Sequence, residues 1–128
     1  MDVYISGLVP MLKAKDLTET ITFYTTILGF AVQSRADSDD GSPYWCCLKR
    51  DGAMVMFYSM DAAKGPPTMT GVLYFYPKDV KALWDDLKDR AAVEWDLQLM
   101  DYGMLEFAIR DCNGYTLSFG QSAEETSN

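Results

Sequence analysis

Glu106 is the side chain with the clearest potential for chemistry, because it stands in a predicted strand among methionine, aromatic and aliphatic residues. A carboxylate is costly to bury unless a hydrogen-bond donor or a cation satisfies it. Arg110, Lys13 or the backbone could be that donor, and the role of Glu106 would then be structural. Alternatively, Glu106 anchors a ligand or acts as a general base.

Other catalytic groups are scarce in this chain. It contains no histidine, which excludes the Ser-His-Asp triad, the Cys-His dyad and every metal site that depends on imidazole. Of the three cysteines, Cys46 and Cys47 are adjacent and Cys112 stands alone, so no Cys-x-x-Cys pair is present. We therefore expect reduced, partly buried thiols rather than a zinc site or a disulfide.

Aromatic side chains accompany Glu106 on the predicted strands and could stack on a planar ligand. Core packing explains any one of them equally well, so the prediction rests on the whole set. Methionine would adapt the site to ligands of varied shape. The predicted ligand-binding residues are Trp45, Met56, Tyr58, Tyr74, Tyr76, Trp95, Tyr102, Glu106 and Ser118.

The first half of the chain is expected to form one β-α-β-β-β unit. Asp16, followed three residues later by Glu19, is typical of a helix N-terminus. The apolar spacing that follows predicts a helix over residues 17–28, with Gly29 as its C-terminal stop. Strands are expected at residues 8–14, 30–36, 44–50 and 53–59.

The second half repeats the pattern of the first. Residues 60–69 contain Gly65-Pro66-Pro67 and are the expected linker. After them, Lys78-Asp79 matches Lys15-Asp16 and begins a second amphipathic helix. Strands are expected at residues 70–76, 93–100, 104–110 and 115–120.

The repeat predicts an α+β protein that forms a single domain over residues 1–128. Its two tandem βαβββ modules would span about residues 7–60 and 69–121, followed by a polar tail at residues 122–128. Each module would curve a mixed sheet, with its helix on the outer face and the inner faces enclosing a groove.

The side-chain period of two predicts which strand residues face that groove. In the last two strands, Phe107 and Phe119 would face the helices, whereas Glu106 and Ser118 would line the groove. The same alternation turns Tyr74 inward. The predicted groove is therefore rich in aromatic and methionine side chains and holds one carboxylate.

The charge balance limits the partners. The chain has 11 lysine and arginine residues against 19 aspartate and glutamate residues, a net charge of −8. This charge would repel nucleic acid and steer cationic ligands toward the protein. No apolar run approaches the roughly 20 residues that span a bilayer, and no signal peptide is recognisable. We expect a cytoplasmic protein with no membrane partner.

Two segments together resemble a known family. One contains Lys15-Asp16-Leu17 and the run from Phe23-Tyr24 to Leu28-Gly29-Phe30, and the other runs from Tyr102 to Tyr115. They resemble the vicinal oxygen chelate superfamily, which includes glyoxalase I, extradiol dioxygenases, fosfomycin resistance enzymes and bleomycin resistance proteins. Cys112 departs from the pattern by replacing its usual proline.

The metal-dependent members hold an ion with histidine or glutamine and glutamate on the first, fourth, fifth and eighth strands. Carried over within one residue, these positions are Val9, Met56, Val72 and Ser118. Transition metals prefer imidazole, thiolate or carboxylate ligands, which this set lacks. The resemblance therefore implies no metal and no cofactor, and it favours the metal-free bleomycin resistance branch, whose members are dimers that sequester a bulky ligand unaltered.

The sequence thus predicts a metal-independent homodimer that sequesters a small aromatic or cationic compound, as in antibiotic resistance. One alternative is a metal-free lyase- or isomerase-like enzyme of the same fold, with Glu106 as its general base. Another is a regulatory or structural relative with an empty groove. Whether the modules pair within one chain or exchange across the dimer stays open.

Overall fold

The computed structural model describes residues 3–59 and 66–125. The predicted linker therefore lies partly outside the described residues, at 60–65, as does the predicted tail at 126–128. Two βαβββ modules follow each other, as predicted. The first contains β1 (Met11–Lys13), α1 (Leu17–Thr26), β2 (Ala31–Asp37), β3 (Pro43–Arg50) and β4 (Ala53–Tyr58). The second contains β5 (Leu73–Phe75), α2 (Val80–Leu87), β6 (Ala92–Leu99), β7 (Met104–Arg110) and β8 (Thr116–Ser122), followed by a short 3-10 helix (Ala123–Glu125).

Both helices begin at the aspartates that the sequence repeat singles out. The Asp16 carboxylate accepts a hydrogen bond from the backbone N–H of Glu19 at 2.9 Å. The Asp79 carboxylate accepts one from the backbone N–H of Ala82 at 3.0 Å. Each carboxylate satisfies one of the donors that a first helical turn leaves unpaired. The two modules therefore begin their helices at equivalent points.

Each module forms one mixed four-stranded sheet. Sheet A has the order β1-β4-β3-β2, and sheet B has the order β5-β8-β7-β6. In both sheets the first strand of the module is parallel to its neighbour, and the other pairs are antiparallel. The parallel pair requires a crossover, which the rest of the module supplies. The predicted α+β fold is confirmed.

The first strand of each module is shorter than the sequence predicts. The strands expected over residues 8–14 and 70–76 are limited to β1 (Met11–Lys13) and β5 (Leu73–Phe75). Pro10, directly before β1, has no N–H to donate. At the other end, β8 extends past its predicted boundary because Ser122 pairs with Met104. The tail expected from residue 122 therefore begins inside the sheet.

The predicted alternation of the strand residues is confirmed by the ring contacts of the core. The Phe57 ring of β4 lies 5.0 Å from the Tyr24 ring of α1, measured between centroids. The Phe107 ring of β7 lies 5.2 Å from the Trp84 ring of α2. These strand residues face the helices, so their neighbours along each strand point to the opposite face.

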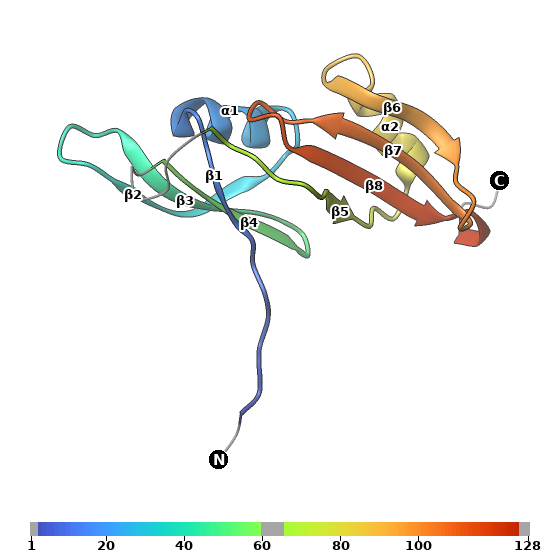
Figure 1. The fold of residues 1–128 in the computed structure, drawn as a ribbon, viewed down its shortest axis with the longest axis horizontal. Helices are drawn as coiled ribbons and strands as arrows, with labels where there is room; N and C mark the ends of the chain where they lie inside the picture. The colour runs from blue at the N-terminus through green and yellow to red at the C-terminus, as the bar shows by residue number, and fades with distance from the viewer. Residues whose placement is uncertain (1–2, 60–65, 126–128) are drawn as a thin grey trace.

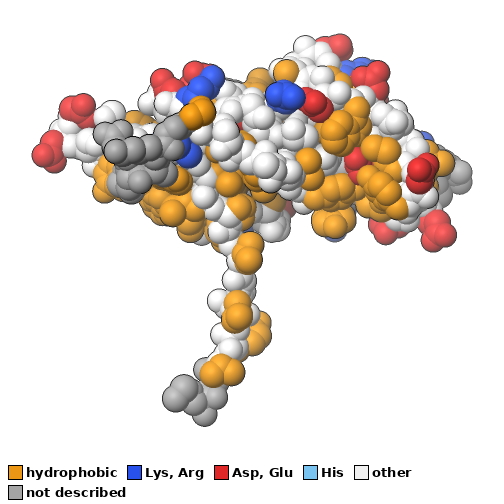
Figure 2. Space-filling model, viewed as in Figure 1, with side chains coloured by type: hydrophobic (Ala, Val, Ile, Leu, Met, Phe, Trp, Pro, Cys, Tyr) orange, Lys and Arg blue, Asp and Glu red, His pale blue; other side chains and the backbone are white. Residues whose placement is uncertain are grey.

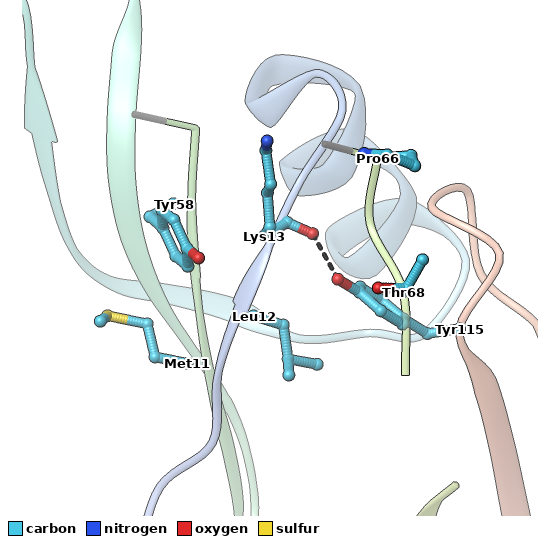
Figure 3. Close-up of a pocket in the computed structure, with 7 residues that line it drawn as sticks. All are labelled: Met11, Leu12, Lys13, Tyr58, Pro66, Thr68 and Tyr115. Carbon is cyan, nitrogen blue, oxygen red and sulfur yellow. Dashed lines mark hydrogen bonds between the residues drawn. The ribbon is translucent and has the colours of Figure 1, made fainter. Parts of the chain in front are cut away.

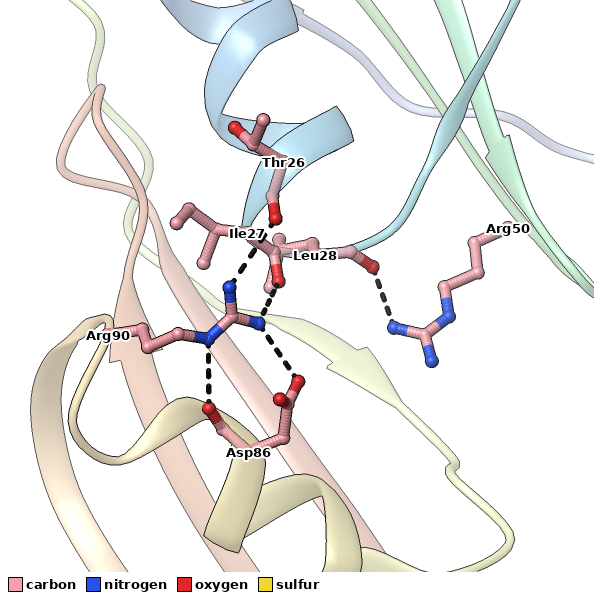
Figure 4. Close-up of polar contacts among 6 residues, drawn as sticks. All are labelled: Thr26, Ile27, Leu28, Arg50, Asp86 and Arg90. Atoms are coloured by element: carbon pink, nitrogen blue, oxygen red, sulfur yellow. Dashed lines mark hydrogen bonds and ion pairs between the residues drawn. The ribbon is translucent and has the colours of Figure 1, made fainter.

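Two arginines donate hydrogen bonds to backbone carbonyl groups at the C-terminal end of α1 (Figure 4). The Arg90 guanidinium, just beyond α2, donates to the carbonyl oxygen of Ile27 at 3.1 Å and to the Asp86 carboxylate at 3.0 Å. From the end of β3, Arg50 donates to the carbonyl oxygen of Leu28 at 2.6 Å. These bonds satisfy carbonyl groups that the helix leaves without intrahelical donors, and Arg90 links the two modules.

A buried carboxylate makes a second link between the modules. The Asp111 carboxylate, in the turn between β7 and β8, accepts a hydrogen bond from the Tyr24 hydroxyl of α1 at 2.8 Å. It also accepts the backbone N–H groups of Asn113 at 2.9 Å and Tyr115 at 2.8 Å. Burial nevertheless raises the pKa of Asp111 above its ordinary value, because these bonds only partly replace the lost hydration.

The two sheets lie side by side along the long axis of the molecule (Figure 1). The chain before β1 extends away from both of them as an arm, residues 3–8, all of which are exposed. The arm carries several apolar side chains, and Leu8 is 90% exposed (Figure 2). Neither helix in the described residues has the length and apolar character that crossing a bilayer requires.

The cysteines are free thiols, as the sequence predicts. Burial raises the pKa of Cys46 to about 11 and that of Cys112 to about 11. Because the thiolate is the reactive form of cysteine, both groups are weak nucleophiles at neutral pH.

Candidate ligand-binding site

Glu106 lies in the middle of β7, on the face of sheet B opposite α2, and is 2% exposed. Its Oε1 atom accepts hydrogen bonds from the Tyr74 hydroxyl at 2.9 Å and the Tyr102 hydroxyl at 2.5 Å. The interpretation of Arg110 as its partner is wrong, because Arg110 pairs with Glu94 on the neighbouring strand. Two phenols that the sequence predicts as ligand contacts therefore satisfy the buried carboxylate.

Tyr74 reaches Glu106 by crossing over Gly120 of β8. A Cβ atom at position 120 would lie 1.9 Å from the Tyr74 hydroxyl oxygen and 2.7 Å from its Cζ atom. Gly120 is the residue paired with Glu106 across β7 and β8, so the phenol ends above this pair. This role of Gly120 was not predicted from the sequence, although a glycine inside a strand is a recognised sign that another group approaches the backbone closely.

Two tyrosine side chains at this hydrogen-bonded group are largely exposed. Tyr76 is 77% exposed and Tyr102 is 63% exposed. The ring centroids of Tyr74 and Tyr76 are 5.1 Å apart. We call these three residues, Tyr74, Tyr76 and Tyr102, the tyrosine cluster. Apolar side chains gather on this face of sheet B (Figure 2). Because the Tyr76 and Tyr102 side chains are exposed there, a ligand could stack on their rings.

Glu106 favours the protonated form of two phenols of the cluster, those of Tyr74 and Tyr102. Its hydrogen bond raises the pKa of Tyr102 above the ordinary value. The pKa of Tyr74 is raised first by burial and then by the hydrogen bond to Glu106. In both cases a phenolate would lose the bond and face a negative carboxylate. The Tyr74 and Tyr102 hydroxyls are therefore neutral at physiological pH.

A row of paired residues crosses sheet B beside Glu106. Tyr74 pairs with Ser118, Ser118 with Ala108, and Ala108 with Trp95. Ser118 and Ala108, the two small residues in the middle of this row, are almost completely buried. The large side chains at its ends, Tyr74 and Trp95, are the neighbours that can cover them. The Trp95 indole Nε1 is buried and lacks a hydrogen-bond partner in the described part of the chain.

The other predicted ligand-binding residues lie on sheet A. Trp45 pairs with Tyr58, and Tyr58 pairs with Lys13. Next to this row, Met56 pairs with Met11 and Cys47. A cavity of about 220 Å³ opens beside β1 (Figure 3). Its volume is below roughly 300 Å³, the lower end of the range for small-molecule binding pockets. It is lined by Met11, Leu12, Lys13, Tyr58, Pro66, Thr68 and Tyr115.

The structure therefore divides the predicted site residues into two groups. Sheet B brings one group together, and the second group lies on sheet A, at the other end of the molecule (Figure 1). The sheet B group is Tyr74, Tyr76, Trp95, Tyr102, Glu106 and Ser118, and the sheet A group is Trp45, Met56 and Tyr58.

The positions that correspond to metal ligands in the resembled family do not fit a transition metal. Met56 offers a thioether, Val72 offers no donor atom, and the Ser118 hydroxyl is almost completely buried. Within residues 3–59 and 66–125, no group of three or more histidine, cysteine, aspartate or glutamate side chains could hold a metal ion.

Comparison with known proteins adds to this geometry. The family model of the Glyoxalase/Bleomycin resistance protein/Dioxygenase superfamily matches residues 9–119. No curated protein matches the chain in sequence.

Solved structures share the fold at low sequence identity. TioX from Micromonospora sp. ML1 has a TM-score of 0.75 and 17% identity, over 91% of this chain and 99% of its own. TnmS3, an antibiotic binding protein from Streptomyces sp. CB03234, has a TM-score of 0.74 and 21% identity, over 94% and 99%. A bleomycin-binding protein complexed with bleomycin has a TM-score of 0.70 and 21% identity, over 92% and 99%.

These likenesses show the fold, and the family match covers both modules. The paired βαβββ units, their mixed sheets and their capped helices are consistent with that match. The chain therefore belongs to the glyoxalase/bleomycin resistance protein/dioxygenase superfamily.

Proposed function

We propose that this protein is a metal-independent binding protein that sequesters a small aromatic or cationic compound on the tyrosine cluster. The observation that carries the proposal is the pair of exposed rings, Tyr76 and Tyr102, beside a buried carboxylate that accepts two phenol hydrogen bonds. Exposed aromatic rings supply stacking surface with little loss of side-chain entropy. The buried carboxylate adds a fixed negative charge beneath them.

Charge and relatives support the same proposal. The net charge of −8 attracts cations at long range. TnmS3 is described as an antibiotic binding protein, and another solved structure of this fold contains bleomycin. The strand positions that correspond to metal ligands in the family, which include Met56, Val72 and Ser118, lack suitable donor atoms. They favour a site that works without a metal ion. A resistance-like role, in which the compound is held and left unaltered, accounts for these features together.

We further propose that the working form is a homodimer. The tyrosine cluster is open, and the aromatic and methionine side chains of sheet A lie elsewhere in the same chain. A second copy could place its sheet A opposite the sheet B of the first and so complete a groove. The apolar arm at residues 3–8 extends away from both sheets. A partner subunit could bury it.

The enzyme hypothesis assigns Glu106 the role of general base. A general base must contact the proton that it removes, directly or through one water molecule. Here Glu106 is buried, and Tyr74 and Tyr102 both donate to its Oε1 atom. This arrangement favours binding over turnover. Conversion of a bound compound that ends with Glu106→Gln would instead support the enzyme hypothesis.

Titration of the protein with bleomycin and a panel of planar cations tests the proposed function. We expect quenching of tryptophan fluorescence and a raised melting temperature, both unchanged after treatment with EDTA. Mass spectrometry should recover the bound compound unaltered. Tyr102→Ala should weaken binding by about tenfold, the upper end of one aromatic contact. Tyr44→Ala, which removes a half-exposed tyrosine from sheet A, should leave the affinity unchanged.

The opposite results would reject the proposal. Quenching that requires an added metal would contradict metal independence, and a chemically altered compound would favour the enzyme. Failure of every cation to bind would show that the tyrosine cluster is not a cation site.

A further inference from the structure

We infer that Glu106 is a positioning residue that makes the tyrosine cluster selective for ligands that donate hydrogen bonds. Such ligands are planar compounds that carry amino, ammonium or amidine groups. The inference rests on the proposed binding function and adds to it the polarity of the ligand and the atoms that select it.

The hydrogen-bond inventory of the two phenols is the first step. Each tyrosine hydroxyl has one hydrogen to donate and lone pairs that can accept. Tyr74 and Tyr102 both direct their hydrogens to Oε1 of Glu106, at 2.9 Å and 2.5 Å. Neither phenol then has a hydrogen left for a ligand. Toward an approaching molecule, the two oxygens offer lone pairs alone.

The carboxylate fixes this direction. An ionised carboxylate accepts hydrogen bonds and cannot donate them, so the phenols cannot reverse their bonds while Glu106 is charged. Bonds to a charged acceptor are also stronger than bonds between neutral groups. Because Glu106 is buried, water cannot easily replace the two donors. The structure therefore holds the hydroxyls in one orientation before a ligand arrives.

The nearby polar groups reinforce this preference. Arg110, the cationic residue at the end of β7, is engaged by Glu94. The Trp95 N–H is buried, so it does not offer a donor to solvent. A ligand with a carboxylate or phosphate would meet lone pairs and a negative charge at Tyr74, Tyr102 and Glu106. A ligand with an amino or amidine group would donate to the phenol oxygens while its ring stacks on Tyr76 or Tyr102.

A cation could be recognised at this site in two ways. In one, the ligand pairs directly with Glu106. In the other, which we infer, Glu106 acts through the oxygens of Tyr74 and Tyr102. Replacing these tyrosines with phenylalanine removes the acceptor oxygens and keeps the rings, so it separates the two cases.

The test compares two dyes of the same ring system, proflavine as a planar cation with amino donors and an acridine carboxylate as an anion. Titrations at one ionic strength give the ratio of their dissociation constants. We expect the wild-type protein to prefer proflavine by about tenfold or more, as for one charge-assisted hydrogen bond. The Tyr74→Phe/Tyr102→Phe double variant should lose most of that preference. Tyr76→Phe, on the same face, should retain it.

Glu106→Gln provides the second arm. The glutamine amide donates as well as accepts, so at least one phenol can turn its hydrogen outward, and the preference for proflavine should fall. Asp101→Asn removes the same charge beside Tyr102 and controls for long-range electrostatics. It should change the ratio much less than Glu106→Gln. A purely structural role of Glu106 would weaken both dyes equally and leave their ratio unchanged.

The outcomes separate this inference from the proposed function. Equal binding of both dyes to the wild-type protein would overturn the inference and leave the binding function standing. A preference for proflavine that survives in the double phenylalanine variant would also overturn it, in favour of direct pairing with Glu106. Failure of both dyes to bind would overturn the proposed function and the inference with it. If Glu106→Gln does not fold, the phenylalanine variants decide alone.

Discussion

Tyr74 depends on the absence of a side chain at position 120. Its hydroxyl reaches Glu106 through the space that a Cβ atom would occupy. Gly120 has a backbone conformation that any residue can adopt, because its φ angle is not positive. An alanine there would strain the packing rather than the backbone. The position therefore offers a way to move Tyr74 without altering the strand.

We predict that Gly120→Ala lowers the free energy of unfolding by about 1–3 kcal/mol, the usual cost of overpacking. Combining it with Tyr74→Ala should be less destabilising than the sum of the two single changes, because the clash disappears. Urea denaturation of the single and double variants measures this. Gly71→Ala is the control, since no atom lies within 4 Å of its added Cβ. A loss at Gly120 no greater than at Gly71 would contradict the observed packing.

At the scale of elements, polar contacts of α1 connect the two modules. Arg90 follows α2 and donates to a carbonyl group just beyond α1, whereas Asp111 accepts the hydroxyl of Tyr24. Both contacts join residues of different modules. They contribute, with the shared hydrophobic core, to the arrangement of the two sheets and so to the position of the tyrosine cluster relative to sheet A.

Replacing Arg90 with methionine should lower the free energy of unfolding by about 1 kcal/mol, the typical net value of a lost hydrogen bond. The carbonyl group of Ile27 would then depend on water. Lys81→Met removes the same charge from an exposed position of α2 and should change stability by less than about 0.5 kcal/mol. Urea denaturation distinguishes the two variants, and equal losses would contradict the bridging role of Arg90.

Asp111 predicts a pH dependence of defined sign. Burial raises its pKa in the folded state above the ordinary value of 3.8. Between these two pKa values the folded state binds more protons than the unfolded state, so the contribution of Asp111 to stability falls as pH rises through that window. The stability of the wild-type protein relative to Asp111→Asn should therefore decrease from acid toward neutral pH.

Asp40 supplies a control of opposite sign. Hydrogen bonds from Ser42 lower the pKa of Asp40, so the stability of the wild-type protein relative to Asp40→Asn should increase as pH rises through the ordinary value. Urea denaturation of both variants across the acid range measures the two slopes. Slopes of the same sign would contradict the assignment of Asp111.

The whole molecule exposes surface that a second copy would bury. Its arm at residues 3–8 lies apart from the sheets, and exposed apolar side chains occupy the open face of sheet B. The strands β1, β2, β5 and β6 lie at the edges of the two sheets, and sheet edges are surfaces that a second chain can cover. These features support the proposed homodimer.

Light scattering should therefore find a dimer of the 14.4 kDa chain at micromolar concentration. The double variant Ile5→Asp/Leu8→Asp should weaken the dimer at least tenfold, because each buried aliphatic side chain contributes about 1.5–3 kcal/mol. Thr18→Asp/Thr22→Asp adds the same charge on the exposed face of α1 and should remain dimeric. A wild-type monomer, or an unaffected arm variant, would contradict the dimer.

Local patterns were sufficient to predict the modules. The aspartate caps, the glycine stop and the alternation of strand residues each depend on neighbours within a few positions. They predicted the order of the elements, the helix-facing side of each strand, and Glu106 as a buried carboxylate on the open face. The absence of histidine, together with four donor-poor positions, was likewise a property of the sequence alone.

Tertiary structure decided which of these residues meet. Strand order in sheet B places β5 beside β8 and β8 beside β7, so Tyr74 reaches Glu106 across Gly120, and Arg110 turns to Glu94 instead. It also divided the predicted site between two sheets. Contacts between distant segments depend on strand order and side-chain reach, which no pattern confined to a few neighbouring residues specifies.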